Sequence, residues 1–116
     1  MTRQILRTAL IALASIGGLL LGAAASAHHS VAAEFDTSNQ GELEGEITRV
    51  WFTNPHIRYQ LTIRRDDGTT EDWELQAGNV TGLQRQGWFE DTIKVGDRVT
   101  VAGDFGRGGA QKLRIR

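Results

Sequence analysis

The chain has no cysteine, one proline and one methionine, which is Met1. Without cysteine, no disulfide can stabilise the fold, even in an oxidising compartment. The length suits one small domain, with no room for a second. The free energy of folding must therefore come from a single hydrophobic core.

No charged residue occurs between Arg7 and the histidine pair that starts at His28. This apolar run follows a positive start and ends in the small residues Ala25-Ser26-Ala27, a pattern typical of a signal-peptidase site. We predict that residues 1–27 are a signal peptide and that the mature protein is periplasmic or secreted. An uncleaved membrane anchor is the alternative, because the run is nearly long enough to span a bilayer.

Positive charge is scarce once the signal peptide is removed. The leader carries Arg3 and Arg7 but none of the 14 acidic residues, which then outnumber the remaining basic ones. An acidic surface does not attract nucleic acid or anionic lipid over distance. We therefore expect no nucleic-acid partner, and no membrane association after cleavage.

Most of the mature chain has the alternation of β-strands. Residues 28–41 form a polar lead-in without a clear period, and the domain proper is predicted over 42–116. Ile57, Tyr59, Leu61 and Ile63 alternate with polar residues, which is the clearest strand pattern in the chain. The other predicted strands cover residues 42–52 and 70–76, a segment through Val99 and Val101, and residues 111–116.

One segment breaks the strand pattern. Val80, Leu83 and Trp88 are spaced unlike a strand, so we predict a short helix from Val80 to Gln86, capped by Asn79 and ended by Gly87. Three strands, a short helix and two strands are the element order of an OB-like, five-stranded Greek-key barrel. The alternative is an open β-sandwich with the helix packed on one side.

Five segments carry a resemblance to a known family. They read AHHSVAAEFD, GEITRVWFTNPH, DWEL, GLQRQGW and IKVGDRVTVAGD, and together they cover nearly all of the mature chain. The pattern HHS…TNPH…RQGW…VGD resembles an uncharacterised family, a domain of unknown function found in small exported bacterial proteins. The resemblance implies that HHS and NPH belong to one shared pattern, and it implies no activity.

Histidine is the residue type that points to chemistry. The chain has only three histidines, His28, His29 and His56. After cleavage at Ala27, His28 would offer its α-amine and imidazole as a chelate, and a further imidazole would make a histidine brace. Nitrogen ligands suit Cu(II), Ni(II) and Zn(II), and tetragonal nitrogen sites favour copper. Cleavage after Ala25 would instead place histidine third, which also suits Cu(II).

The first hypothesis is thus a monomeric, exported binding module that holds a divalent metal, copper(II) first among them, through these histidines. The plain alternative is that the exposed pair has no role and His56 fills a turn. A second hypothesis is a structural or partner-binding protein of the cell envelope, with a binding face at Trp51, Phe52 and Trp88. A third, ranked lowest, is an oxidative copper enzyme. Tyr59 and Trp73 are predicted to be core residues by periodicity.

Overall fold

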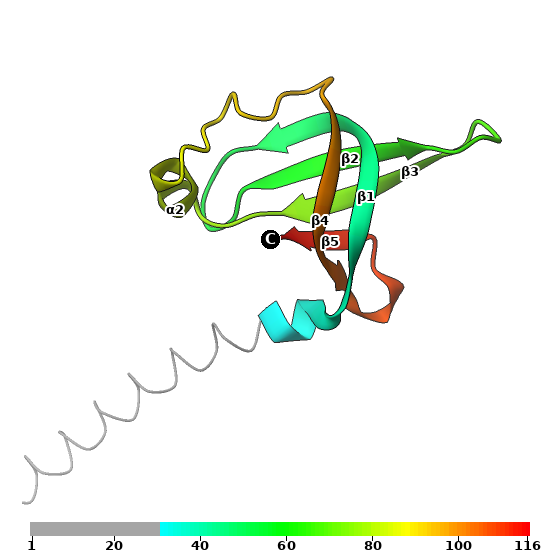
Figure 1. Ribbon diagram of the computed structural model, residues 1–116, viewed down its shortest axis with the longest axis horizontal. Coiled ribbons are helices and arrows are strands. Elements are labelled where there is room, and N and C mark those ends of the chain that lie inside the picture. The colour runs from blue at the N-terminus through cyan, green and yellow to red at the C-terminus, as the bar shows by residue number, and fades with distance from the viewer. Residues whose placement is uncertain (1–30) are drawn as a thin grey trace, which may run out of the picture. The chain divides into compact units, whose positions relative to one another are not determined.

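The computed structural model describes residues 31–116, in which a helical segment at residues 31–34 is followed by five strands and the short helix α2 (Figure 1). Residues Glu34–Arg116 form one compact unit. No helix within the described residues is both long and apolar enough to cross a bilayer. The elements are β1 Phe35–Trp51, β2 Arg58–Arg64, β3 Thr70–Gln76, α2 Val80–Arg85, β4 Arg98–Gly106, a 3₁₀ turn Arg107–Gly109 and β5 Lys112–Ile115.

The strands close into a barrel in the order β1-β2-β3-β5-β4. β1 pairs antiparallel with β4 through its first part and with β2 through its second, and Glu46 pairs on both sides. β3 and β5 are the one parallel pair among the described strands, and β4 and β5 are antiparallel. The predicted OB-like barrel is confirmed, and the open sandwich is wrong.

Side chains that alternate along the strands fill the barrel. Tyr59 and Leu61 from β2 are fully buried, as the alternation predicts. Each of the other strands adds at least one buried apolar side chain. These include Ile47 from β1, Leu75 from β3, Val101 from β4 and Leu113 from β5.

β1 begins earlier than the sequence pattern predicts. We expected a lead-in up to residue 41, but the strand starts at Phe35, which is 1 % exposed. The register of β1 against β4 shifts between Asp36 and Gln40. There the Asp36 carboxylate accepts hydrogen bonds from the backbone N–H and hydroxyl of Ser38, at 3.0 and 2.6 Å. Because this bulge is exposed and polar, the sequence does not show the apolar–polar alternation that would mark the first residues of β1.

Trp73 is less buried than predicted. It lies on β3 and packs against the core, but its side chain is only half-buried. Its ring meets that of Phe105 edge to face, with 5.8 Å between the centroids, and its indole N–H donates to Glu71 at 3.3 Å. An indole places an N–H on a large apolar body, so it suits the margin of a core.

The short helix begins at Val80, as the sequence predicts, and ends at Arg85, one residue before the predicted end. The Asn79 side chain accepts a hydrogen bond from the Gly82 N–H at 2.7 Å, which caps the first turn. Gly87 follows the helix with a φ of +82°, a conformation that glycine adopts without strain. Trp88 then folds back so that its indole N–H donates to the hydroxyl of Tyr59 at 2.9 Å. The segment after the helix is thereby fixed to the core.

Asp104 is the buried charged residue of the barrel, with no exposed surface. Arg114 donates to its Oδ2 at 2.7 and 3.2 Å, and the Arg116 Nε lies 2.9 Å from its Oδ1. Burial alone raises the pKa of this carboxyl, but the two arginines outweigh burial and hold the pKa below its ordinary value. Asp104 and Arg114 face each other across β4 and β5. Their ion pair therefore reinforces the pairing of these two strands.

We expect Leu75→Ala to lower the free energy of unfolding by about 2–5 kcal/mol, because Leu75 is fully buried and its loss leaves a cavity. Urea denaturation measures this change. Val95→Ala is the control, since Val95 is 64 % exposed and its loss should change stability by less than about 0.5 kcal/mol. Equal effects of the two substitutions would contradict the position of the core.

We expect Asp104→Asn to destabilise the protein at pH 7 and to matter less in acid. A carboxyl whose pKa is depressed in the folded state stabilises the fold fully above its unfolded pKa, and that contribution is lost as pH falls through its folded pKa. The stability difference between wild type and variant should therefore shrink below pH ~4. Urea denaturation over a pH series measures it, and a difference that stays constant into acid would count against the ion pairs.

Candidate functional site

The segment between β1 and β2 carries His56. Hydrogen bonds hold this segment against the first residue of α2 and the residues just before α2. The Asn54 side chain accepts a hydrogen bond from the Val80 N–H at 3.0 Å, and the Asn54–Pro55 peptide bond is cis. The Ile57 N–H donates to the carbonyl of Gly78 at 3.0 Å, and Ala77 donates back to Ile57 at 2.8 Å. Hydrogen bonds on both sides of His56 thus fix its backbone at the rim of the barrel.

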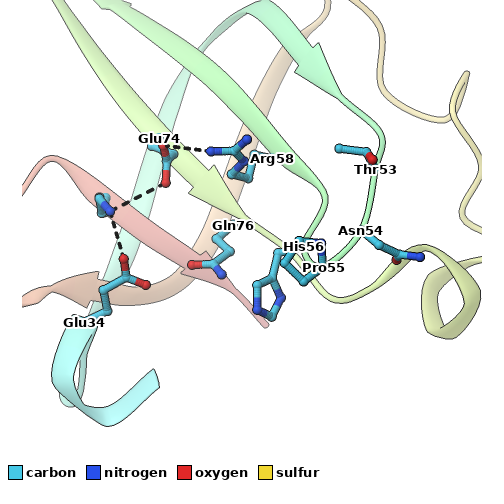
Figure 2. A pocket seen from close by; sticks show the side chains of 9 residues that line it. Glu34, Thr53, Asn54, Pro55, His56, Arg58, Glu74 and Gln76 are labelled. Carbon is cyan, nitrogen blue, oxygen red and sulfur yellow. Dashed lines mark hydrogen bonds and ion pairs between the residues drawn. The ribbon is translucent and has the colours of Figure 1, made fainter. Parts of the chain in front are cut away.

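His56 is half-buried and lines a pocket of about 400 Å³ (Figure 2). The pocket lies over β2, β3 and β5, and the segment before β2 forms one wall. The start of the compact domain forms part of another wall, through Glu34. The lining residues are Glu34, Thr53, Asn54, Pro55, His56, Arg58, Glu74, Gln76 and Lys112.

Opposite charges balance one another in this pocket. The Lys112 ammonium lies 3.0 Å from Glu34 and 3.7 Å from Glu74, and Arg58 lies 3.9 Å from Glu74 (Figure 2). The hydrogen bond to Glu34, assisted by the charge of Glu74 and opposed by burial, raises the pKa of Lys112. Lys112 therefore stays protonated and paired at neutral pH, and the pocket holds two cations beside two carboxylates.

Residues 31–116 hold no group of three or more histidine, cysteine, aspartate or glutamate side chains placed to bind a metal ion. Within this part of the chain, His56 is the one histidine. The predicted ligands His28 and His29 lie outside the described residues.

The three aromatic residues of the predicted binding face differ in their surroundings. Trp51 is 37 % exposed, and the guanidinium of Arg58 lies over its ring, 5.5 Å from the centroid. Phe52 and Trp88 are half-buried and pack against the core. Trp51 ends β1 and Phe52 follows it, and one member of this pair is exposed while the other packs against the core, as predicted.

Trp51 lines a second pocket of about 290 Å³ beside the first. The two pockets share Glu74 and Lys112. The polar side chains of this surface are not among the site residues that the sequence predicts. Alternation marks them as outward-facing, but the parallel pairing of β3 with β5 brings Lys112 beside Glu74, and no local pattern indicates that pairing. The second pocket is lined by Trp51, Tyr59, Gln60, Asp72, Trp73, Glu74, Ala110, Gln111 and Lys112.

The comparison with known proteins gives a family but no activity. No curated protein matches the chain. A family of unknown function, DUF6152, matches residues 18–114, which include the whole barrel except Ile115, the last residue of β5. This match bears out the resemblance seen in the sequence. The chain belongs to the DUF6152 family.

Proposed function

We propose that this protein is an exported, monomeric binding module that holds copper(II) through His28, His29 and His56. The observation that carries the proposal is that His56 and Glu34 line the same pocket. Glu34 is where the compact domain begins, so the chain that bears the histidine pair enters the domain at the pocket of the third histidine.

The length of the connecting chain is compatible with such a site. His28 lies six residues before Glu34. Six residues span at most about 20 Å when fully extended, so the terminus is tethered close to the pocket. A short tether of this kind gives an effective concentration in the millimolar range, which favours a joint site over two separate weak ones.

The available ligands suit copper(II) better than copper(I). A free His28 would supply an amine and an imidazole, and His29 and His56 would add imidazoles, all of which are nitrogen ligands of borderline softness. The chain has no cysteine, and Met1 would leave with the signal peptide. No soft sulfur ligand would then remain to select copper(I).

The charge of the His56 pocket also tolerates a metal cation. An unpaired ammonium would repel a cation, but Lys112 is paired with Glu34 and Glu74. Arg58 faces Glu74 as well. A divalent ion therefore meets a pocket whose fixed charges cancel.

A metal-free envelope protein that binds a partner is the second candidate. The observation in its favour is the exposure of Trp51. Phe52 and Trp88 support it less, because both pack against the core instead of extending one exposed aromatic face. Metal titration separates the two candidates, since a partner-binding protein has no need of the histidines.

We expect protein that begins at His28 to bind copper(II) in a nitrogen-rich tetragonal site. His56→Ala should weaken binding at least about tenfold, because one imidazole ligand is lost. One extra glycine before His28 should disrupt the chelate, because it moves the free amine away from the His28 imidazole. Isothermal titration calorimetry measures the affinity, and electron paramagnetic resonance reports the ligand set.

Gln76→Ala is the matched control, because Gln76 lines the same pocket but is not one of the proposed ligands. It should leave copper affinity unchanged. The proposal is wrong if the protein binds copper no more tightly than a free His-His-Ser peptide and His56→Ala changes nothing. Oxygen consumption with copper and a reductant would indicate an oxidative enzyme instead of a binding module.

We expect copper affinity to fall as pH falls, because a metal competes with protons for its ligands. A free α-amine has an ordinary pKa of about 7.7–8.0. Below this range the proton on that amine should lower the copper affinity about tenfold for each pH unit. Calorimetry between pH 8 and pH 6 measures the slope. Acetylation of the N-terminus should remove this part of the slope, and an unchanged slope would show that the amine is not a ligand.

A further inference from the structure

We propose that the pocket beside Trp51 binds a short, neutral oligosaccharide. This pocket lies over the outer side of β2 and β3 and against the loop of residues 107–111. Its volume of about 290 Å³ is at the small end of the range for small-molecule sites. The proposal does not depend on metal binding at His56.

Trp51 supplies an aromatic platform. Its side chain is 37 % exposed, and Arg58 lies over the ring at 5.5 Å from the centroid. Arg58 lines the neighbouring His56 pocket and is not part of the Trp51 pocket. The guanidinium thus holds the indole in place from outside the site. The C–H face of a pyranose ring is apolar and packs on such a ring.

Polar side chains surround the platform with both donors and acceptors. The side-chain amides of Gln60 and Gln111 make no hydrogen bond within residues 31–116, so they are available to a ligand. The Asp72 carboxylate accepts a hydrogen bond from the hydroxyl of Thr62 at 2.6 Å through Oδ1. Its other oxygen, Oδ2, is left to accept a hydrogen bond from a ligand. Sugar hydroxyls both donate and accept, so they match amides beside carboxylates.

The charges of the pocket favour a neutral ligand over a polyanion. Its walls include Asp72 and Glu74, and its one cation, Lys112, already lies 3.0 Å from Glu34. Binding of nucleic acid depends on unpaired lysine and arginine that replace counterions at the phosphates. OB-folds bind either oligonucleotides or oligosaccharides on strands 2 and 3 and the adjoining loops. Here the carboxylates in the pocket walls and the paired Lys112 favour an oligosaccharide over an oligonucleotide.

The loop that closes the pocket is fixed to the barrel. The Glu74 N–H donates to the carbonyl of Gln111 at 3.0 Å, and the Lys112 N–H donates to Ala110 at 2.8 Å. Gln111 is therefore held beside β3 before any ligand arrives. A site that is already ordered loses less conformational entropy on binding.

Nuclear magnetic resonance of ¹⁵N-labelled protein tests the proposal directly. The chain has three tryptophans, and each gives one indole N–H peak. The indole of Trp88 donates to Tyr59 and that of Trp73 to Glu71. Titration with cellotetraose, maltotetraose or chitotetraose should therefore move the Trp51 peak, with a Kd on the order of 1 mM, and should move it further than the Trp88 peak, because Trp88 does not line the pocket.

Two substitutions locate the site. Trp51→Ala should weaken binding at least about fivefold, as expected for loss of a stacking platform, and the backbone N–H peaks of the pocket residues report binding to this variant because it has no Trp51 indole peak. Gln111→Ala removes an exposed polar contact in a loop and should also weaken binding, and it serves if the Trp51 variant does not fold. Phe89→Ala is the matched control, because Phe89 is an aromatic residue, 50 % exposed, that does not line the pocket.

The proposal is overturned if none of the three sugars moves the Trp51 peak at concentrations on the order of 10 mM, ten times the expected Kd. It is also overturned if Phe89→Ala weakens binding as much as the two pocket substitutions. A single-stranded oligonucleotide or an unstructured peptide that moves the Trp51 peak when the sugars do not would assign the pocket to another class of ligand. None of these outcomes bears on copper binding at His56.

Discussion

The double pairing of β1 is the constraint on which the barrel depends. Its first part pairs with β4 and its second with β2, so the strand must turn from one neighbour to the other near Glu46. Gly45 permits this turn, because a Cβ there would lie 2.6 Å from the carbonyl oxygen of Thr62. The register also shifts between Ile47 and Arg49, and such bulges bend a strand and increase its twist. Without this bend β1 could not serve both neighbours, and β4 could not return to close the barrel.

Closure of the barrel also creates the surface that we propose to be functional. It places β5 parallel to β3, so that Lys112 pairs with Glu74 across the two strands. The segment that carries His56 lies on one side of this pair, and the loop of residues 107–111 lies on the other. Both pockets therefore draw on the same two residues, although their remaining walls come from distant parts of the chain.

The sequence predicts the parts of this fold that depend on local patterns. Alternation locates Tyr59 and Leu61 in the core, and Asn79 and Gly87 mark the ends of the helix. The start of β1 was missed because the exposed bulge around Ser38 interrupts the period, although Phe35 itself is buried. The burial of Trp73 was overestimated because alternation gives the direction of a side chain but not its distance from the centre of the barrel. For the site, residue type alone points to His56 and Trp51, but only the pairing of β3 with β5 brings Glu74 and Lys112 together.

The balance of charge across the two pockets limits what the whole surface can bind. Arg58 and Lys112 face Glu34 and Glu74, and Asp72 adds a further negative charge. A polyanion would have to compete with these carboxylates for both cations, at the cost of leaving the carboxylates unpaired. A metal cation at His56 and a neutral sugar at Trp51 require no such exchange, because neither has to break an existing ion pair. The same ion pairs that link β2, β3, β5 and Glu34 therefore also select the kinds of ligand that this face of the barrel can accept.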